Sequence, residues 1–236
     1  NGLIFSGEPG RSLTWMDAVI HGKPVTPRIG YDVEINALWY NAVRFALELA
    51  RNARDSRFIS QWKEIPEKTG KSFIEHFWNP ELGYCADYVN GNYRDFSVRP
   101  NMVIAASLPY TPLSDEMINS ILGIVERELL TPKGLRTLSP NDPAYIGIYE
   151  GDQASRDAAY HQGTVWPWLL QPYAMAYLKL HKTSGIGHLR KIVEGFESDM
   201  SEYGVGTVGE IFDGDPPHLP RGSISQAWSV AALLWI

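Results

Sequence analysis

The apolar and polar positions of this chain alternate between two kinds of helical segment. The first kind is apolar over most of its circumference. From the capping residue Asp32 to about Asn52, the polar positions are confined to one narrow stripe, Asn41, Arg44, Glu48 and Arg51. Residues 101–108, 164–181 and those from about Ser223 onward are similarly apolar. Helices of this kind are expected to be buried on several sides.

The second kind of segment carries a narrower apolar stripe among charged residues. It covers residues from about 56 to 78, 115–130 and 187–203. A kink or break is expected near Pro66 and Gly70 in the first of these, and a bend at Pro172 in the inner helix of residues 164–181. Residues 79–98 predict turns with a short hairpin around Asn90-Gly91, and residues 131–163 a long loop whose length favours a functional role.

The order inner, outer, inner, outer predicts an all-α fold of the α/α-toroid type. Consecutive helices joined in this way lie antiparallel, so the inner helices point the same way and their N-terminal loops share one rim. About seven helices are visible from the periodicity, too few for a ring of the (α/α)6-barrel type. We therefore expect residues 1–236 to be the C-terminal portion of a single α/α-barrel domain, with the missing helix pairs upstream.

Composition and charge narrow the possible partners. The chain has a net charge of −6 and no dense basic patch, which excludes nucleic acid as an expected partner. No stretch resembles a membrane span, so no membrane partner is expected. The single Cys85 excludes an internal disulfide. Because there is no close helical pair of histidines and no Gly-rich phosphate loop, neither a metal nor a cofactor is expected.

Two carboxylates on separate rim loops are the candidate chemistry. Asp17 precedes the first inner helix and Glu210 the last. Glycoside hydrolysis with inversion needs a protonated carboxyl for the leaving oxygen and an ionised one, roughly 6.5–9.5 Å away, for the attacking water. Trp15 beside Asp17 would desolvate that acid. The plainer alternative is that both are turn or cap residues, and Glu34, in a first helical turn, is more readily structural or substrate-binding than catalytic.

Other polar and aromatic residues on these loops are candidates for contact with a sugar. Arg28, Arg99 and Asn101 can donate to hydroxyl groups, although loop salt bridges and caps are the commoner roles of such residues. His161 and Gln162 precede Trp166-Pro167-Trp168. Either indole can form the floor of a sugar subsite or belong to the core.

Six motifs stand in order along nearly the whole chain. They are Thr14-Trp15-Met16-Asp17-Ala18, Val25-Thr26-Pro27-Arg28, Val33-Glu34-Ile35-Asn36-Ala37-Leu38-Trp39-Tyr40-Asn41-Ala42, Tyr160-His161-Gln162-Gly163-Thr164-Val165-Trp166-Pro167-Trp168, Gly209-Glu210-Ile211-Phe212-Asp213-Gly214 and Pro220-Arg221-Gly222-Ser223-Ile224-Ser225-Gln226-Ala227-Trp228-Ser229. Together they resemble the C-terminal glucosidase domain of glycogen debranching enzymes, the amylo-α-1,6-glucosidase family. In the last motif, Ser223 stands where a cysteine is common in that family.

The resemblance implies an (α/α)6 barrel and an inverting, exo-acting α-1,6-glucosidase that removes glucose from branch points of glycogen-like glucans. It implies Asp17 as general acid and Glu210 as general base, no metal or cofactor, a branched α-glucan substrate and a cytoplasmic location. A homo-oligomer, or association with a missing N-terminal part, would cover the open flanks. The residues expected to bind substrate are Trp15, Arg28, Glu34, Asn36, Trp39, Arg99, Asn101, His161, Gln162, Trp166 and Asp213.

Two other interpretations stay open at this point. The chain is a non-catalytic glucan-binding fragment, or it belongs to another α/α-toroid enzyme, a trehalase-like or glucoamylase-like hydrolase or a sugar epimerase. An epimerase needs paired basic residues at the centre of the cavity, and only His161 and His218 stand on the rim loops. Fold analogy alone does not decide the substrate.

Overall fold

The structure is a computed structural model that describes residues 1–236. Ten α-helices and two short 3-10 helices form most of it. The helices are α1 (Val33–Asn52), α2 (Ser56–Trp62), α3 (Ile65–Phe77), α4 (Asn101–Ser107), α5 (Asp115–Glu128), α6 (Gln153–Ala159), η1 (Pro167–Leu169), α7 (Leu170–His181), η2 (Lys182–Gly185), α8 (Ile186–Glu194), α9 (Glu197–Glu202) and α10 (Ala227–Trp235).

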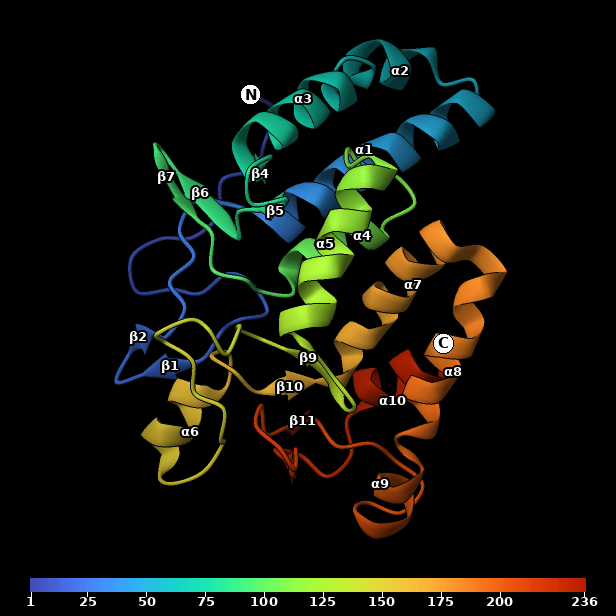
Figure 1. The fold of residues 1–236 in the computed structure, drawn as a ribbon. Helices are drawn as coiled ribbons and strands as arrows, with labels where there is room; N and C mark the ends of the chain where they lie inside the picture. Colours follow the sequence, from blue (N-terminus) through green and yellow to red (C-terminus); the bar gives the residue numbers. More distant parts are fainter.

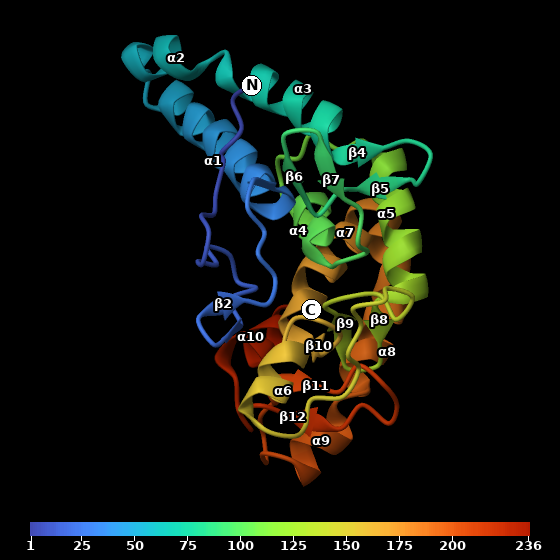
Figure 2. The ribbon, with the colours of Figure 1, turned by 90° about the vertical axis from the view of Figure 1, so that its left-hand side faces the viewer.

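The inner helices α1, α4, α7 and α10 form an arc in which each contacts the next. Figures 1 and 2 show α1 and α10 at its two ends. Helices α2 and α3 pack on α1, and α5 packs on both α4 and α7. The buried core lies between these layers and includes Phe73, Phe77, Ile121 and Tyr173, all fully buried. The predicted alternation of inner and outer helices therefore describes α1 to α5 and α7. The prediction of a long loop over residues 131–163 was wrong in part, because that segment contains the strand β9 (Gly134–Arg136) and the two-turn helix α6.

The prediction of an all-α fold is too strict, because short strands connect the helices. Buried loop backbone needs hydrogen-bond partners, and Val165, Ile211 and Phe212, which are fully buried, obtain them in a five-stranded antiparallel sheet of order β12-β11-β10-β9-β8. A second sheet has the order β3-β6-β7, and β1-β2 and β4-β5 are separate pairs. The strands are β1 (Val19–Ile20), β2 (Lys23–Pro24), β3 (Tyr31–Asp32), β4 (Trp78–Asn79), β5 (Tyr84–Cys85), β6 (Tyr88–Asn90), β7 (Tyr93–Asp95), β8 (Leu130–Thr131), β9 (Gly134–Arg136), β10 (Val165–Trp166), β11 (Ile211–Phe212) and β12 (Pro220–Arg221).

Most predicted element boundaries agree with the structure within a few residues. Helix α1 begins directly after Asp32, although the Asp32 side chain makes no capping bond. The expected break in the 56–78 segment falls between α2 and α3, and Pro66 lies in the first turn of α3, where proline is tolerated. The hairpin around Asn90-Gly91 is present as β6 and β7. The 187–203 segment is divided at Gly195 and Phe196 into α8 and α9.

Burial of the inner helices is incomplete at the two ends of the arc. On α1, Leu38, Phe45 and Leu49 expose 44%, 51% and 52% of their surface. On α10, Leu234 is 83% exposed. The expectation of burial on several sides therefore holds for α4 and α7 and fails for one flank each of α1 and α10.

No helix of the chain combines the length and apolar character needed to cross a membrane.

Candidate active site

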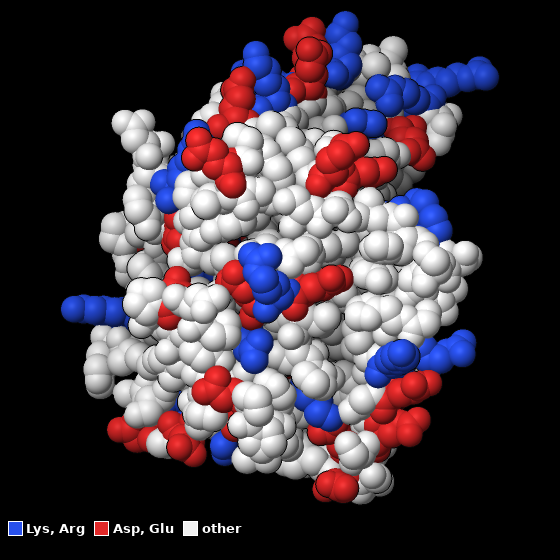
Figure 3. Space-filling model, in the orientation of Figure 1, with Lys and Arg blue, Asp and Glu red and all other residues white.

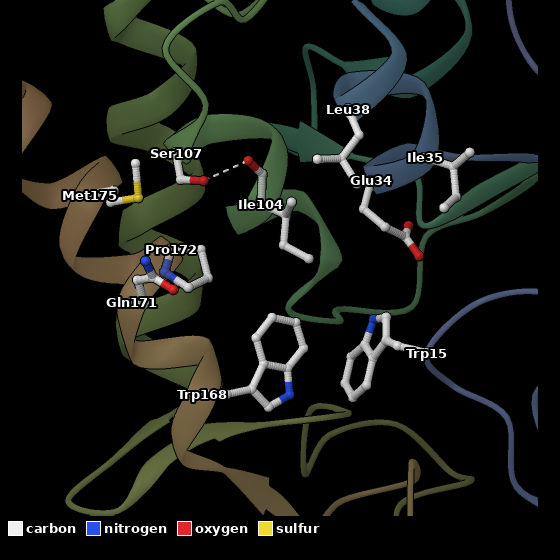
Figure 4. A pocket seen from close by; sticks show the side chains of 10 residues that line it. All are labelled: Trp15, Glu34, Ile35, Leu38, Ile104, Ser107, Trp168, Gln171, Pro172 and Met175. Atoms are coloured by element: carbon white, nitrogen blue, oxygen red, sulfur yellow. Dashed lines mark hydrogen bonds between the residues drawn. The ribbon is translucent and has the colours of Figure 1, made fainter. Parts of the chain in front are cut away.

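An apolar cavity lies among three of the inner helices. Its volume is about 390 Å³, and its walls come from α1, α4 and α7. Trp15 and Trp168 form one side of the cavity in Figure 4, and the Glu34 carboxylate points toward Trp15. The remaining lining residues are Ile35, Leu38, Ile104, Ser107, Gln171, Pro172 and Met175. Neither Asp17 nor Glu210 lines this cavity.

A chain of hydrogen bonds fixes Trp15 to the polar residues behind the cavity. The Trp15 indole donates to the Asn101 side-chain oxygen at 2.7 Å. The Asn101 amide donates to Asp87 at 2.7 Å, and the second oxygen of Asp87 lies 2.7 Å from Nε of Arg28. Asp87 is therefore the centre of the network, and sequence reasoning missed it because it stands in a segment interpreted only as turns.

The Arg28 guanidinium holds Glu34 in a bidentate pair. Its two terminal nitrogens donate to the two Glu34 oxygens at 2.5 and 2.6 Å, and all of these groups are buried. Burial alone would lower the pKa of Arg28, but the charges of Asp87 and Glu34 together raise it. Asp32 is 3.7 Å from Nε of Arg28 and receives a bond from the Ser6 hydroxyl. Burial outweighs these partners and raises the pKa of Asp32 to about 7.

Arg99 connects the same network to the loop before η1. It donates to the carbonyl of His161 at 2.8 Å and to the Gln162 side-chain oxygen at 2.5 Å. Its Nε lies 3.9 Å from Asp87. Arg99 is buried, and its polar atoms face protein partners. Arg28 and Arg99 thus hold other site residues in place, which agrees with the salt-bridge alternative given for them from sequence.

Aromatic rings surround Trp15 on three sides. Its ring meets His161, Trp166 and Trp168 edge-on, at centroid distances of 5.3, 5.6 and 5.2 Å. His161 stacks on Trp166 with an interplanar angle of 14°, and neither imidazole nitrogen has a partner. Burial, together with the charge of Arg99, lowers the pKa of His161 to about 3. His161 is therefore a neutral ring that supports Trp15.

Glu210 is held at both of its oxygens. Tyr160 donates its hydroxyl to one oxygen at 2.5 Å, and the backbone N–H of Ser223 donates to the other at 2.9 Å. Burial raises the pKa of Tyr160, and its bond to Glu210 and the negative charge of Asp17 add to this. Asp17 itself is exposed. Tyr160 therefore connects Glu210 to the aromatic rings around Trp15, and its role was not foreseen from sequence.

Three predicted substrate-binding residues make their side-chain bonds outside the Trp15 network and the Tyr160–Glu210 contact. The Asn36 amide is buried and bonds to the backbone of Ile4 and Asp32. The Trp39 indole donates to the Gly2 carbonyl and faces α2, where its ring meets Trp62 at 5.9 Å. The Asp213 carboxylate is buried and accepts from the Tyr149 backbone and from Arg221. Of the other predicted residues, Asp17 is exposed and its carboxylate makes no hydrogen bond or ion pair within the chain. The rest belong to the Trp15 network or to the Tyr160–Glu210 contact, and they are Trp15, Arg28, Glu34, Arg99, Asn101, His161, Gln162, Trp166 and Glu210.

The surface and the side-chain chemistry give no sign of a metal centre. No group of three or more His, Cys, Asp or Glu side chains is arranged to hold an ion. On the face drawn in Figure 3, Lys and Arg side chains are interspersed with Asp and Glu. The candidate site therefore consists of carboxylates, indoles and hydrogen-bond donors from the chain itself.

Known proteins resemble the whole of this chain or about half of it. Glycogen debranching enzyme of Saccharomyces cerevisiae is 28% identical over 300 residues, which covers 99% of this chain and 19% of that protein. Periplasmic trehalase of Salmonella newport is 25% identical over 130 residues, covering 54% of this chain and 22% of that protein. The chain thus spans about a fifth of the length of these relatives.

Solved structures share the fold at lower identity. An uncharacterized conserved protein from Thermus thermophilus superposes with a TM-score of 0.62 at 19% identity, over 89% of this chain and 49% of that chain. GH63 mannosylglycerate hydrolase from the same organism, in complex with glucose, has a TM-score of 0.62 at 18% identity and the same coverage. The family model described as amylo-alpha-1,6-glucosidase matches residues 1–235. The resemblance noted in the sequence motifs is confirmed, and the chain belongs to the amylo-alpha-1,6-glucosidase family.

Proposed function

We propose that this chain carries the reacting groups of an inverting glycoside hydrolase that removes α-1,6-linked glucose from branch points of glycogen-like glucans. Asp17 acts as the general acid and Glu210 as the general base. The observation that carries the proposal is the Tyr160 hydroxyl, which donates to Glu210 at 2.5 Å. The Tyr160 ring packs on Trp166 at 4.9 Å, and Trp166 meets Trp15, which stands two residues before Asp17 in the sequence.

The proposed reaction assigns one proton transfer to each acid. Asp17 donates its proton to the glycosidic oxygen as the bond to the anomeric carbon breaks. A water molecule attacks that carbon from the opposite face while Glu210 takes its proton, so α-linked glucose is released as the β anomer. Two donors, the Tyr160 hydroxyl and the Ser223 backbone N–H, hold the Glu210 carboxylate in one orientation. Trp15, fixed through Asn101, provides an apolar face for the glucose ring.

The test separates the two acids with a substrate whose leaving group needs no proton. In the full-length protein, Asp17→Asn should abolish turnover of a branch-point glucosyl oligosaccharide but retain turnover of α-glucosyl fluoride. Glu210→Gln should abolish both, and added azide should restore the reaction of the fluoride as β-glucosyl azide. Glu194→Gln, an exposed position on α8, is the matched control.

Either of two results would count against this assignment. One is release of α-glucose as the first product, since inversion requires the β anomer. The other is equal activity of Asp17→Asn and the wild type on the oligosaccharide, which would leave a non-catalytic glucan-binding role. The similarity to trehalase over 54% of the chain makes α,α-trehalose the second substrate to assay, and turnover of trehalose alone would favour that alternative.

We also propose that further helices complete the arc into an (α/α)6 ring. The exposed apolar flanks of α1 and α10 support this, because apolar surface of this kind is usually covered. The solved relatives are about twice as long as the part that matches. Expressed alone, residues 1–236 should therefore be marginally stable or should self-associate, which light scattering measures. A cytoplasmic location is proposed on the resemblance to the yeast enzyme alone.

A further inference from the structure

The loop that carries the proposed general acid is attached to the rest of the chain on both sides of that residue. Met16 and Ala18 are buried, whereas Asp17 between them is exposed. The Ala18 carbonyl accepts from the backbone N–H of Val25 at 2.9 Å. Because the Asp17 carboxylate makes no bond within the chain, its position is set by the groups that hold its neighbours.

Two buried side chains hold the residue directly before the acid. The Thr26 hydroxyl donates to the Met16 carbonyl at 2.9 Å. The Asn101 amide donates to the sulfur of Met16 at 3.3 Å. Thr26, Asn101 and Met16 are all buried, so water cannot replace either bond and breaking one would leave a polar group without a partner. The path of the chain up to Asp17 therefore depends on Thr26 and Asn101.

The Asn101 side chain has a partner for each of its polar atoms inside the protein. Its oxygen accepts from the Trp15 indole at 2.7 Å. Its amide nitrogen donates to Asp87 at 2.7 Å and to Met16. An indole is a donor only, so the bond from Trp15 fixes which way the amide faces. An amide has two donors, and Asn101 therefore has none left for the hydroxyl group of a sugar.

The direction of these bonds requires an acceptor at position 87. One oxygen of Asp87 accepts from Asn101, and the other lies 2.7 Å from Nε of Arg28 and 3.9 Å from Nε of Arg99. An amide at this position would turn its NH₂ group toward another donor, either the Asn101 amide or a guanidinium. Asp87 is buried, so water could not separate the two donors. A carboxylate is therefore the side chain that fits.

We propose that Asp87 is a positioning residue for the general acid, Asp17. Asp87 holds the Asn101 amide, and that amide holds Trp15 and Met16, the two residues directly before the acid. The inference rests on the proposed function, because it concerns the acid assigned there. Asp87 does not line the apolar cavity and acts through Asn101 alone. A displacement of about 1 Å in a reacting group can lower a rate about 100-fold, so a buried hydrogen bond behind the loop is enough to control the acid.

The test uses a leaving group that needs no proton. In the full-length protein, Asp87→Asn should lower kcat for a branch-point glucosyl oligosaccharide about 100-fold and keep kcat for α-glucosyl fluoride within about threefold of the wild type. Thr26→Val removes the bond to the Met16 carbonyl without removing a charge, and it should lower the first rate about tenfold and spare the second. The matched control is Glu126→Gln, a carboxylate that accepts from Tyr173 between α5 and α7. Thermal unfolding checks that each variant folds.

A second measurement follows the loop without turnover. Methionine is oxidised by hydrogen peroxide according to its exposure, and Met16 is fully buried. Peptide mass spectrometry should show that Met16 is oxidised at least about fivefold faster in Asp87→Asn and in Thr26→Val than in the wild type. Met102, buried on α4, is the internal reference, and its oxidation should not change.

Each outcome decides the proposal. Equal losses of kcat on both substrates would indicate a general disturbance of the site and overturn it. Unchanged kcat for the oligosaccharide, or unchanged oxidation of Met16, in the folded variants also overturns it. If the wild type hydrolyses no branch-point oligosaccharide but Met16 is oxidised faster in the variants, the proposed function fails and the attachment of the loop stands. Thr26→Val decides the same questions if Asp87→Asn does not fold.

Discussion

The Tyr160 hydroxyl is the most direct place to test how the proposed base is held. Tyr160→Phe removes the 2.5 Å bond to Glu210 and keeps the ring, which packs at 4.8 Å from His161 and 4.9 Å from Trp166. A hydrogen bond to a charged group contributes about 2 kcal/mol. At about 1.4 kcal/mol per tenfold change in rate, its loss should lower kcat roughly 30-fold.

The separate effects on kcat and KM distinguish this loss from a general disturbance. The hydroxyl orients Glu210 toward the attacking water, so its removal should lower kcat and leave KM for α-glucosyl fluoride within about twofold of the wild type. The backbone bond from Ser223 remains in the variant, so activity should fall without disappearing.

The assay is turnover of α-glucosyl fluoride by the full-length protein between pH 4 and pH 8, compared with thermal unfolding. Tyr149→Phe is the control, because its ring is next to Tyr160 but the bond to Glu210 comes from Tyr160. The reasoning is refuted if Tyr160→Phe keeps kcat within about threefold of the wild type, or if Tyr149→Phe lowers kcat to the same extent.

Three further predictions concern stability and are read by equilibrium unfolding. The pKa of Asp32 rises from 3.8 to about 7 in the folded protein. The protonated carboxyl group therefore stabilises the fold fully below pH 3.8, and this contribution is lost as the pH rises through 7. Asp32→Asn should therefore gain stability relative to the wild type between pH 5 and pH 8, and a constant difference would contradict this. Arg28→Met leaves Glu34 and Asp87 without their cation and should lower the free energy of unfolding by about 3–5 kcal/mol. A decrease below about 1 kcal/mol would contradict this. Phe73→Ala leaves a cavity at a fully buried position and should lower the free energy of unfolding by about 3–5 kcal/mol. A smaller decrease would indicate that neighbouring core residues move to fill the cavity.

The helices were predictable because their period lies within continuous segments. The narrow polar stripe of α1 and the cap position of Asp32 located that helix to within a residue. The strands were not, since elements of two or three residues contain no alternation to detect. Their pairing depends on partners far away in sequence, as in Val165 opposite both Arg136 and Phe212.

The candidate site was predictable at the level of loops and less so at the level of contacts. Trp15, Asn101 and Glu34 were singled out because each stands near the N-terminus of an inner helix, and the structure places them around one network or cavity. Asp87 was missed because its importance arises from Arg28, 59 residues away in sequence. Asn36 stands in the same motif as Glu34, but its side chain points from α1 toward the N-terminal segment and bonds to Ile4.

The closely packed tryptophan rings allow ligand binding to be detected by intrinsic fluorescence. Trp168 stacks on Trp228 at 5.2 Å, and Trp15 lies 5.2 Å from Trp168 and 5.6 Å from Trp166. Rings this close share excitation energy, so a molecule that enters the cavity lined by Trp15 and Trp168 should quench or shift the emission of the whole group. Occupancy can therefore be followed by intrinsic fluorescence, without a label and without turnover.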